Sequence, residues 1–255
     1  MTAPGDRGGI EPPARSPFVV RRYRHRMRLA SIRRYPVKSM GGEPLDSVEI
    51  DGRGLTGDRW FAVIDEDGKL ASGKNSRRFR RRDAVFEHGA RTLPTGEIEV
   101  SDGRSTWLVG TPTLDERLSA AMGAAVEVRR ETAVSHQDGG QVSLVGSATL
   151  DWFAHEWGID ADPRRLRVNL VVDTDQPFVE ERWVAHRLAI GSAVLTVDAK
   201  VPRCRMIDLA QDGATAEQRW LNRLTQERDM CAAVYLDVTT PGMIAVGDSV
   251  GLERP

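Results

Sequence analysis

The chain has 255 residues, 40% hydrophobic and 29% charged, which is typical of a soluble globular protein large enough to bury a core. Its net charge of −1 provides no global field that attracts nucleic acid or membrane, and no apolar run is long enough to span a bilayer. The only cysteines, Cys204 and Cys231, exclude an iron–sulfur cluster held by four cysteines and require no oxidising compartment. We therefore expect a cytoplasmic protein that binds neither nucleic acid nor membrane.

The first 26 residues differ from the rest, with four prolines and an arginine-rich stretch over residues 21–26. Such a segment buries too little apolar surface to offset its ordering entropy, so we expect a disordered tail, with Met27 as an alternative start. An arginine-rich, acid-poor leader is also typical of an organelle transit peptide, although no apolar face at helical spacing supports that alternative.

Short strands dominate the remaining chain. Apolar alternation and turn signals predict strands over 29–37, 45–50, 59–64, from 70, 98–100, 107–109, 126–129, 166–172, 188–197, 232–238 and 246–252. Helices are predicted over 114–122, over 148–157 with Ser147 as the N-cap, and over about 215–229.

This pattern predicts a mainly β protein with peripheral helices, an α+β architecture without the strand–helix alternation of doubly wound folds. The polar segment 131–140 marks a boundary between an N-terminal domain, 27–130, and a second domain, 131–255. We expect two packed β-rich units, at least one of them a barrel.

Cys204 is the first candidate for chemistry, because Arg203 and Arg205 flank it. Nearby cations favour a thiolate over a thiol, and a thiolate is a soft metal ligand. An inert packed cysteine is the alternative, and spacing alone does not decide between them. Cys231 lies in an apolar stretch and is interpreted as a core residue.

Several polar residues are suited to binding an anion. Lys38 and Ser39 precede two glycines, and lysine charge beside a close backbone approach suits a phosphate. Arg59 opens an apolar strand and can clamp a phosphate or carboxylate with two hydrogen bonds. A solvated lysine and a surface pair of Arg59 with Asp58 are the alternatives.

Arg167 and Asn169 are two residues apart on a predicted strand and therefore share one face. Two buried polar side chains on an apolar strand need a partner, which a ligand with many acceptors would supply.

The run 77–82 contains five arginines and one phenylalanine. We expect a solvated face there, with docking of an acidic redox partner as the alternative; one aromatic residue is thin support for nucleic-acid binding. The five histidines show no zinc-type spacing.

Taken together, these segments resemble the MOSC family, most closely its branch with an N-terminal β-barrel domain, which includes the mitochondrial amidoxime-reducing component. The matching residues run from about 29 to 252. They are Tyr35–Ser39, the Gly54–Arg59 motif and Trp60, Arg167–Asn169, Pro177-Phe178-x-Glu180-x-x-Trp183, Leu188-x-Ile190-Gly191, Arg203-Cys204 and Pro241-Gly242-x-Ile244-x-Val246-Gly247-Asp248.

The resemblance implies a MOSC β-barrel packed against an N-terminal β-barrel-like domain, with a molybdenum cofactor between them. It makes Cys204 the protein ligand to molybdenum and the catalytic residue. The residues implied to bind the cofactor are Lys38, Ser39, Arg59, Ser147, Thr149, Arg167, Asn169 and Arg203. This chain has valine at position 168, where relatives usually have proline.

The resemblance also implies an enzyme, a molybdenum-dependent reductase of N-hydroxylated small molecules. Some relatives carry a ferredoxin domain, but this chain ends at Pro255 without the cysteines for one, so we expect a separate protein as electron donor. Two alternatives stay open: a sulfur carrier with a persulfide on Cys204, and a non-catalytic cofactor carrier.

Overall fold

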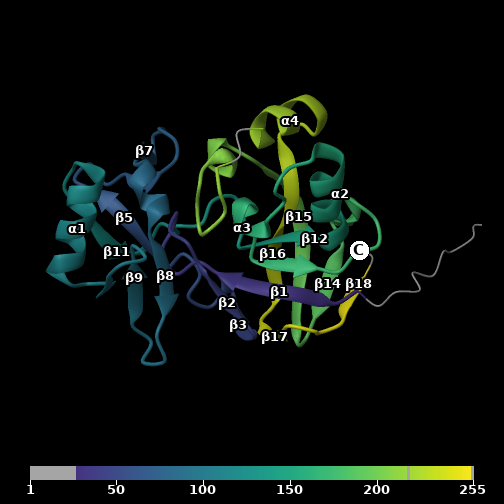
Figure 1. Ribbon diagram of the computed structural model, residues 1–255. Helices are drawn as coiled ribbons and strands as arrows, with labels where there is room; N and C mark the ends of the chain where they lie inside the picture. Colours follow the sequence, from purple (N-terminus) through teal and green to yellow (C-terminus); the bar gives the residue numbers. More distant parts are fainter. Residues whose placement is uncertain (1–26, 217–218, 254–255) are drawn as a thin grey trace, which may run out of the picture.

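Two β-rich units lie side by side in the computed structural model, which describes residues 27–216 and 219–253 (Figure 1). The expected N-terminal tail, 1–26, lies outside these residues. No helix of the described chain has the length and apolar character needed to cross a membrane. The predicted mainly β architecture with few peripheral helices is confirmed.

The first unit packs one helix against two small sheets. One sheet has the order β11-β5-β6-β7 and the other β10-β9-β8. The elements are β5 (Phe61–Asp65), β6 (Leu70–Ser72), β7 (Phe79–Arg81), η1 (Asp83–Glu87), β8 (Gly89–Thr92), β9 (Ile98–Ser101), β10 (Thr106–Leu108), α1 (Pro112–Met122) and β11 (Val126–Arg130).

Helix α1 contributes one apolar face to the core of this unit. Leu114, Leu118 and Met122 are four residues apart and therefore lie on one buried face. The helix ends at Gly123, whose left-handed conformation (φ 62°) matches the sequence-based prediction.

The second unit is built on an eight-stranded sheet with the order β18-β14-β15-β16-β12-β13-β1-β2. Beside it lies a three-stranded sheet, β17-β3-β4. The strands are β1 (Leu29–Arg34), β2 (Glu43–Leu45), β3 (Ser47–Asp51), β4 (Gly54–Leu55), β12 (Val142–Gly146), β13 (Leu170–Val172), β14 (Arg187–Ile190), β15 (Ala193–Pro202), β16 (Cys231–Thr240), β17 (Gly242–Ala245) and β18 (Val250–Glu253). The helical elements are α2 (Ser147–Trp157), α3 (Pro163–Leu166), η2 (Val179–Trp183), η3 (Arg205–Asp208) and α4 (Trp220–Glu227).

The sheet of the second unit is open. Strands β18 and β2 form its edges, and an isolated bridge between Arg28 and Ser249, with backbone hydrogen bonds between residues 27–29 and 247–250, brings the start of β1 toward β18. Among the described residues no closed barrel is found, so the barrel closure expected for the two units is corrected to open sheets.

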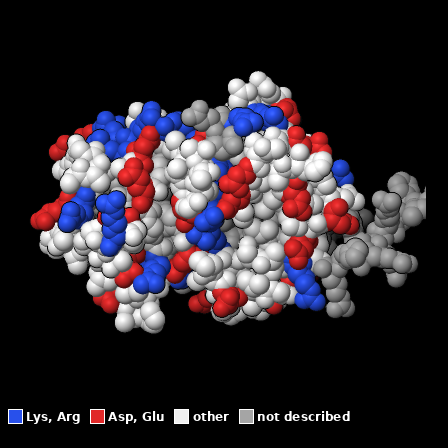
Figure 2. Space-filling model, viewed as in Figure 1, with Lys and Arg blue, Asp and Glu red and all other residues white. Residues whose placement is uncertain are grey.

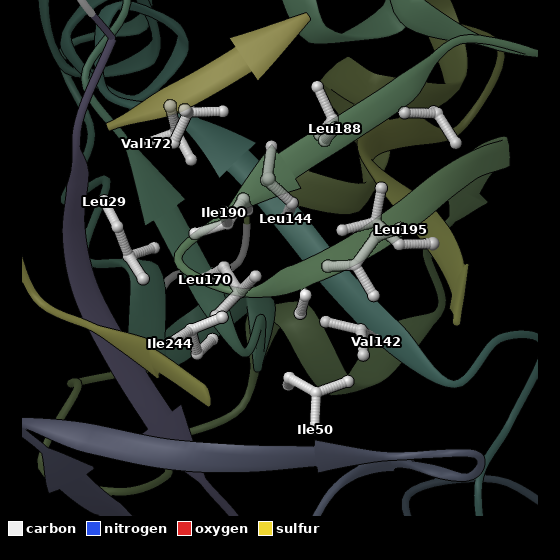
Figure 3. Packing of buried hydrophobic residues seen from close by; sticks show 14 of the residues in the cluster. Leu29, Ile50, Val142, Leu144, Leu170, Val172, Leu188, Ile190, Leu195 and Ile244 are labelled. Carbon is white, nitrogen blue, oxygen red and sulfur yellow. The ribbon is translucent and has the colours of Figure 1, made fainter. Parts of the chain in front are cut away.

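The apolar core of the second unit includes residues from both ends of the chain. Leu29 and Ile50 pack with Leu144, Leu170 and Ile244 (Figure 3). Strand β1 pairs with β13, and β3 pairs with β17. The predicted division between 130 and 131 therefore does not separate the two cores, because β1–β4 precede it but pack into the second unit.

Three predicted elements differ in detail. The strand expected over 166–172 is only β13, because α3 occupies 163–166 and Arg167 is left-handed (φ 52°). Gly191 (φ 56°) splits the strand expected over 188–197 into β14 and β15. Gly146 rather than Ser147 is the N-cap of α2, with no side-chain cap.

Candidate functional site

A cavity of about 390 Å³ lies between the two units, a volume within the range of small-molecule sites. Its walls come from the loops after β1 and β4, from β6 and β7, from the segment before β12, from α3 and the loop after it, and from the end of β15. The lining residues are Lys38, Ser39, Arg59, Ser72, Lys74, Arg78, Phe79, Asp138, Gly139, Gly140, Ser143, Arg165, Leu166, Arg167, Asn169, Val201, Pro202, Arg203, Cys204, Met206, Ile207 and Tyr235.

The walls are strongly cationic. Seven lining residues are lysine or arginine, and Asp138 is the only lining carboxylate. Such an excess of positive charge around a cavity favours an anionic ligand. Six of the eight residues expected to bind a cofactor line this cavity together with Cys204.

Lys38 is buried, with 4% of its surface exposed. Its Nζ atom lies 3.0 Å from the Asp138 carboxylate, in an ion pair that lacks good hydrogen-bond geometry. Burial disfavours the ammonium and lowers the pKa of Lys38 to about 8, although Asp138 opposes that shift. A ligand anion would stabilise the Lys38 ammonium and so offset part of the cost of its burial.

Arg59 and Arg167 both contact the ring of Tyr35, with guanidinium carbons 4.9 and 4.4 Å from its centroid. Arg59 pairs with the buried Asp58. Arg167 donates to the Met40 carbonyl oxygen at 2.7 Å, and burial lowers its pKa. Among the described residues it forms no ion pair, so its charge is available to a ligand.

Three residues of this wall have left-handed backbones although they are not glycine. The φ angles are 69° for Ser39, 54° for Arg59 and 52° for Arg167. Non-glycine residues in this region are strained, and such strain concentrates at ligand sites. This geometry replaces the shared strand face predicted for Arg167 and Asn169.

Arg203 presents an unpartnered nitrogen. Its Nε and Nη1 atoms donate to the carbonyl oxygens of Ala232 and Leu166, at 2.8 and 2.6 Å. Its buried Nη2 atom has no hydrogen-bond partner, and burial lowers the pKa of Arg203 to about 10. A buried donor without a partner is costly, and an anion in the cavity would satisfy it.

Cys204 follows β15 in an extended conformation, as a free and half-buried cysteine. Arg205 does not line the cavity; it pairs with Asp83 at 2.9 Å and donates to the Gly73 carbonyl oxygen. In the described part of the chain, no group of three or more His, Cys, Asp or Glu side chains is arranged to hold a metal. A metal at Cys204 therefore has to bring most of its ligands with it.

Asn169 has a positioning role. Its side-chain oxygen accepts from the Ser143 amide and hydroxyl at 3.2 and 3.1 Å, and its amide nitrogen donates to the Arg33 carbonyl oxygen. The Ser39 hydroxyl donates to the Ala71 carbonyl oxygen. These bonds connect the cavity wall to both units.

Ser147 and Thr149 are not brought to the cavity. The Ser147 hydroxyl accepts from the Thr174 amide at 3.1 Å, and the buried Thr149 hydroxyl accepts from the Phe178 amide at 2.7 Å. Neither residue lines the cavity, since both hydroxyls hold the segment after β13, so their predicted cofactor contacts have no support in this cavity.

Sequence reasoning missed several lining residues, including Lys74, Arg78 and Asp138. Arg78 belongs to the arginine run interpreted as a solvated face; it donates to the Gln137 carbonyl oxygen. Gly139 and Gly140 lie against Tyr235, and a Cβ atom at Gly140 would come within 2.7 Å of that ring. The sequence Asp138-Gly139-Gly140, inside the predicted boundary segment 131–140, could have indicated a close approach of the backbone to a ligand.

Comparison with known families places two matches along the chain. The MOSC N-terminal beta barrel domain matches residues 26–102, and the MOSC domain matches residues 131–251. The family match therefore includes both sides of the cavity.

Curated relatives include two proteins named molybdenum cofactor sulfurase. The Danio rerio protein is 38% identical over 75 residues, which cover 29% of this chain and 9% of that protein. The Drosophila mojavensis protein is 26% identical over 229 residues, which cover 75% of this chain and 29% of that protein. The chain thus spans less than a third of either relative.

Two solved structures are similar at low identity. The YuaD protein from Bacillus subtilis has a TM-score of 0.48 and 12% identity, over 91% of this chain and 97% of that one. YiiM from Geobacillus stearothermophilus has a TM-score of 0.35 and 14% identity, over 44% of this chain and 54% of that one.

Proposed function

Because this chain belongs to the MOSC family, with a MOSC N-terminal domain ahead of its MOSC domain, we propose that its cavity binds the molybdenum cofactor. The observation that carries the proposal is the meeting of Cys204 with seven cations and a single carboxylate in one cavity. A pterin with a phosphate group and a metal needs both features: cations for the phosphate and a soft anionic sulfur for the metal.

The donor set of the cavity fits such a group. The Nη2 atom of Arg203 and the Nζ atom of Lys38 are buried without a hydrogen bond, and Arg167 is buried without an ion pair among the described residues. These three cations would hold the phosphate and neighbouring polar atoms. Arg59 and Asn169 would fix the backbone and side chains around them.

Cys204 would be the protein ligand to the metal, and the cofactor would supply the other ligands. When bound, the molybdenum would supply two-electron redox chemistry at the end of β15. The half-buried position of Cys204 would keep the metal close to the surface, within reach of a small substrate. Met206 and Tyr235 would exclude water from part of the wall.

Metal and pterin analysis of protein from a cofactor-competent host tests this proposal. Wild type should carry both, and Cys204→Ala should lose most of its molybdenum. Cys231→Ala is the matched control, because Cys231 does not line the cavity and should leave the metal content unchanged. Folded wild type without molybdenum or pterin would contradict the proposal.

We further propose that the protein reduces N-hydroxylated small molecules with electrons from a separate protein, as the resemblance to the amidoxime-reducing branch implies. The accessible edge of the cavity supports a small-molecule substrate. Reduction of benzamidoxime with an artificial electron donor, lost in Cys204→Ala, is the expected result. Absence of turnover by the cofactor-loaded protein would favour a non-catalytic cofactor carrier.

A sulfur carrier is the second candidate, and the names of the curated relatives favour it. Cys204 would then hold a persulfide, with the charge of Arg203 stabilising its anion. Intact-protein mass spectrometry after loading with a persulfide donor, which passes its outer sulfur to the Cys204 thiolate and leaves as a thiol, should show one added sulfur that is absent in Cys204→Ala. A wild-type protein that takes up no sulfur would exclude this candidate.

A further inference from the structure

Three cations surround a single aromatic ring on one wall of the cavity. The Nζ atoms of Lys38 and Lys74 lie 5.3 and 5.0 Å from the centroid of the Phe79 ring, and the guanidinium carbon of Arg78 lies 5.4 Å from it. Each cation–ring contact is weakly favourable, but the three like charges repel one another. This wall, Lys74–Phe79 with Lys38, is therefore suited to an anion.

The cavity holds more positive charge than is needed to balance a cofactor phosphate. Three of the seven cations have carboxylate partners, in the pairs Lys38–Asp138, Arg59–Asp58 and Arg165–Asp160. The other four form no ion pair within 27–216 and 219–253: Lys74, Arg78, Arg167 and Arg203. A phosphate monoester carries a charge of about −1.5 to −2 at neutral pH, which two of these cations balance.

Burial distinguishes the two cations that would bind the phosphate from the other two. Arg167 is buried and Arg203 has a buried nitrogen without a partner, so both favour the enclosed phosphate. Lys74 is exposed and Arg78 half-buried. Figure 2 shows lysine and arginine side chains gathered over the region of β7. Lys74 and Arg78 are therefore the more exposed of the four cations, and although Arg78 donates to the carbonyl oxygens of Gln137 and Ser135, neither charge has a carboxylate partner among the described residues.

A carboxylate is already stabilised beside this wall. Burial alone would raise the pKa of Asp138, but Lys38, Arg59 and Lys74 lower it below its ordinary value. The buried Lys38 ammonium still lacks a hydrogen bond of good geometry. With Lys38 assigned to the cofactor phosphate, the positive charge that remains for a second carboxylate is that of Lys74 and Arg78.

We propose that Lys74 and Arg78 form an anion subsite on the cavity wall, and that the substrate carries a carboxylate beside the group that is reduced. The inference rests on the proposed reductase function and names its substrate class. A neutral or cationic substrate would leave the two charges unpaired.

Equilibrium binding to the cofactor-loaded protein tests the subsite without turnover. Benzoate and benzamide have nearly the same shape and differ in charge. Benzoate should bind about tenfold more tightly, equivalent to ~1.4 kcal/mol. The double variant Lys74→Gln/Arg78→Gln should reduce the ratio to about twofold, a difference of less than ~0.5 kcal/mol. Arg77→Gln is the matched control, since Arg77 is an exposed neighbour that does not line the cavity.

Equal wild-type affinities for the two probes, or a preference that survives in the double variant, would overturn the subsite. Loss of bound pterin from the double variant would also overturn it, because Lys74 and Arg78 would then hold the cofactor phosphate.

Steady-state kinetics separates the subsite from the proposed function. The ratio of KM for benzamidoxime to KM for 4-carboxybenzamidoxime should be about ten in wild type and near one in the double variant. If neither compound is reduced while the benzoate preference persists, the reductase function fails and the subsite stands. If both are reduced with equal KM in wild type, the reductase function stands and the substrate class is wrong.

Discussion

The Nη2 atom of Arg59 donates a hydrogen bond to the backbone carbonyl oxygen of Arg167, 3.0 Å away and 108 positions later in the chain. Arg59, one cation of the cavity, therefore holds in place the backbone of Arg167, a second cation of the cavity. Both residues are left-handed, and both guanidinium groups contact Tyr35. The cation wall is thus a coupled unit rather than a set of independent surface charges.

Arg59→Lys should disrupt this coupling while keeping the charge. A lysine cannot pair with Asp58 and reach the Arg167 carbonyl oxygen at once, so the buried Asp58 loses part of its compensation. The free energy of unfolding, measured with urea, should fall by about 2–4 kcal/mol, and pterin content should fall with it. Arg81→Lys is the control: its pair with Asp83 is exposed, and little change in the free energy of unfolding is expected.

Affinity for a phosphate monoester should fall as the pH rises through about 8. Lys38 has a pKa of about 8 in the unliganded protein, and a bound dianion raises it. Below pH 8 the ammonium is present before and after binding; above it, binding must take up a proton. Titration calorimetry of the cofactor-free protein with glycerol phosphate, whose second pKa lies near ~6, measures this dependence.

In Lys38→Arg the charge persists throughout this range, so the affinity should not change with pH. A wild-type affinity that stays constant from pH 7 to about 10 would show that the Lys38 ammonium does not contact the phosphate.

Gly140→Ala should damage the cavity wall. The added Cβ atom would lie 2.7 Å from three atoms of Tyr235, so the ring or the loop has to move. Overpacking of this kind costs about 1–3 kcal/mol, and cofactor content should drop. Gly52→Ala is the matched control, because its Cβ atom would meet nothing within 4 Å. Equal thermal stability of the two variants would contradict the packing argument.

Two serines near α2 should behave differently. Ser143→Ala removes the hydroxyl that bonds with the Asn169 side chain and amide, so Asn169 loses one of the three bonds that orient its side chain and bound pterin should decrease. Ser147→Ala removes only a bond to the Thr174 amide, outside the cavity. It should cost about 1 kcal/mol in stability and leave pterin content at the wild-type level. Reduced pterin in Ser147→Ala would restore its predicted cofactor role.

Local patterns sufficed for much of the fold. The hairpin around Gly103 and the helix that ends at Gly123 were predicted because turn glycines and periodicity act within a few residues. Strand partners were not predictable in this way. The pairing of β1 with β13 depends on contacts between residues more than a hundred positions apart. The division predicted between residues 130 and 131 therefore does not coincide with the division between the two apolar cores.

The candidate site residues that could be predicted from the sequence are those whose residue type is unusual for their local sequence. Lys38, Arg59, Arg167, Arg203 and Cys204 all line the cavity. Lys74 was missed because a lone lysine carries no signal of its own, and Arg78 because one arginine of a run looks like any other. Arg80 and Arg81 belong to β7 and pair with acids outside the cavity, whereas Arg78 precedes β7 and lines the cavity. That difference depends on tertiary contacts.

The pairing of β1 with β13 and of β3 with β17 has a consequence for how the protein is made. Residues 61–130 can fold as soon as they leave the ribosome, since the partners in both of their sheets lie within that range. Strands β1 and β3 emerge earlier and have near partners in β2 and β4, but their other partners, β13 and β17, are synthesised more than a hundred residues later. One edge of each strand is therefore without its partner, exposed to chaperones and to wrong partners, until β13 and β17 have been made. Binding of the proposed cofactor would then have to follow the docking of β13 on β1, because one wall of the cavity is attached to β1.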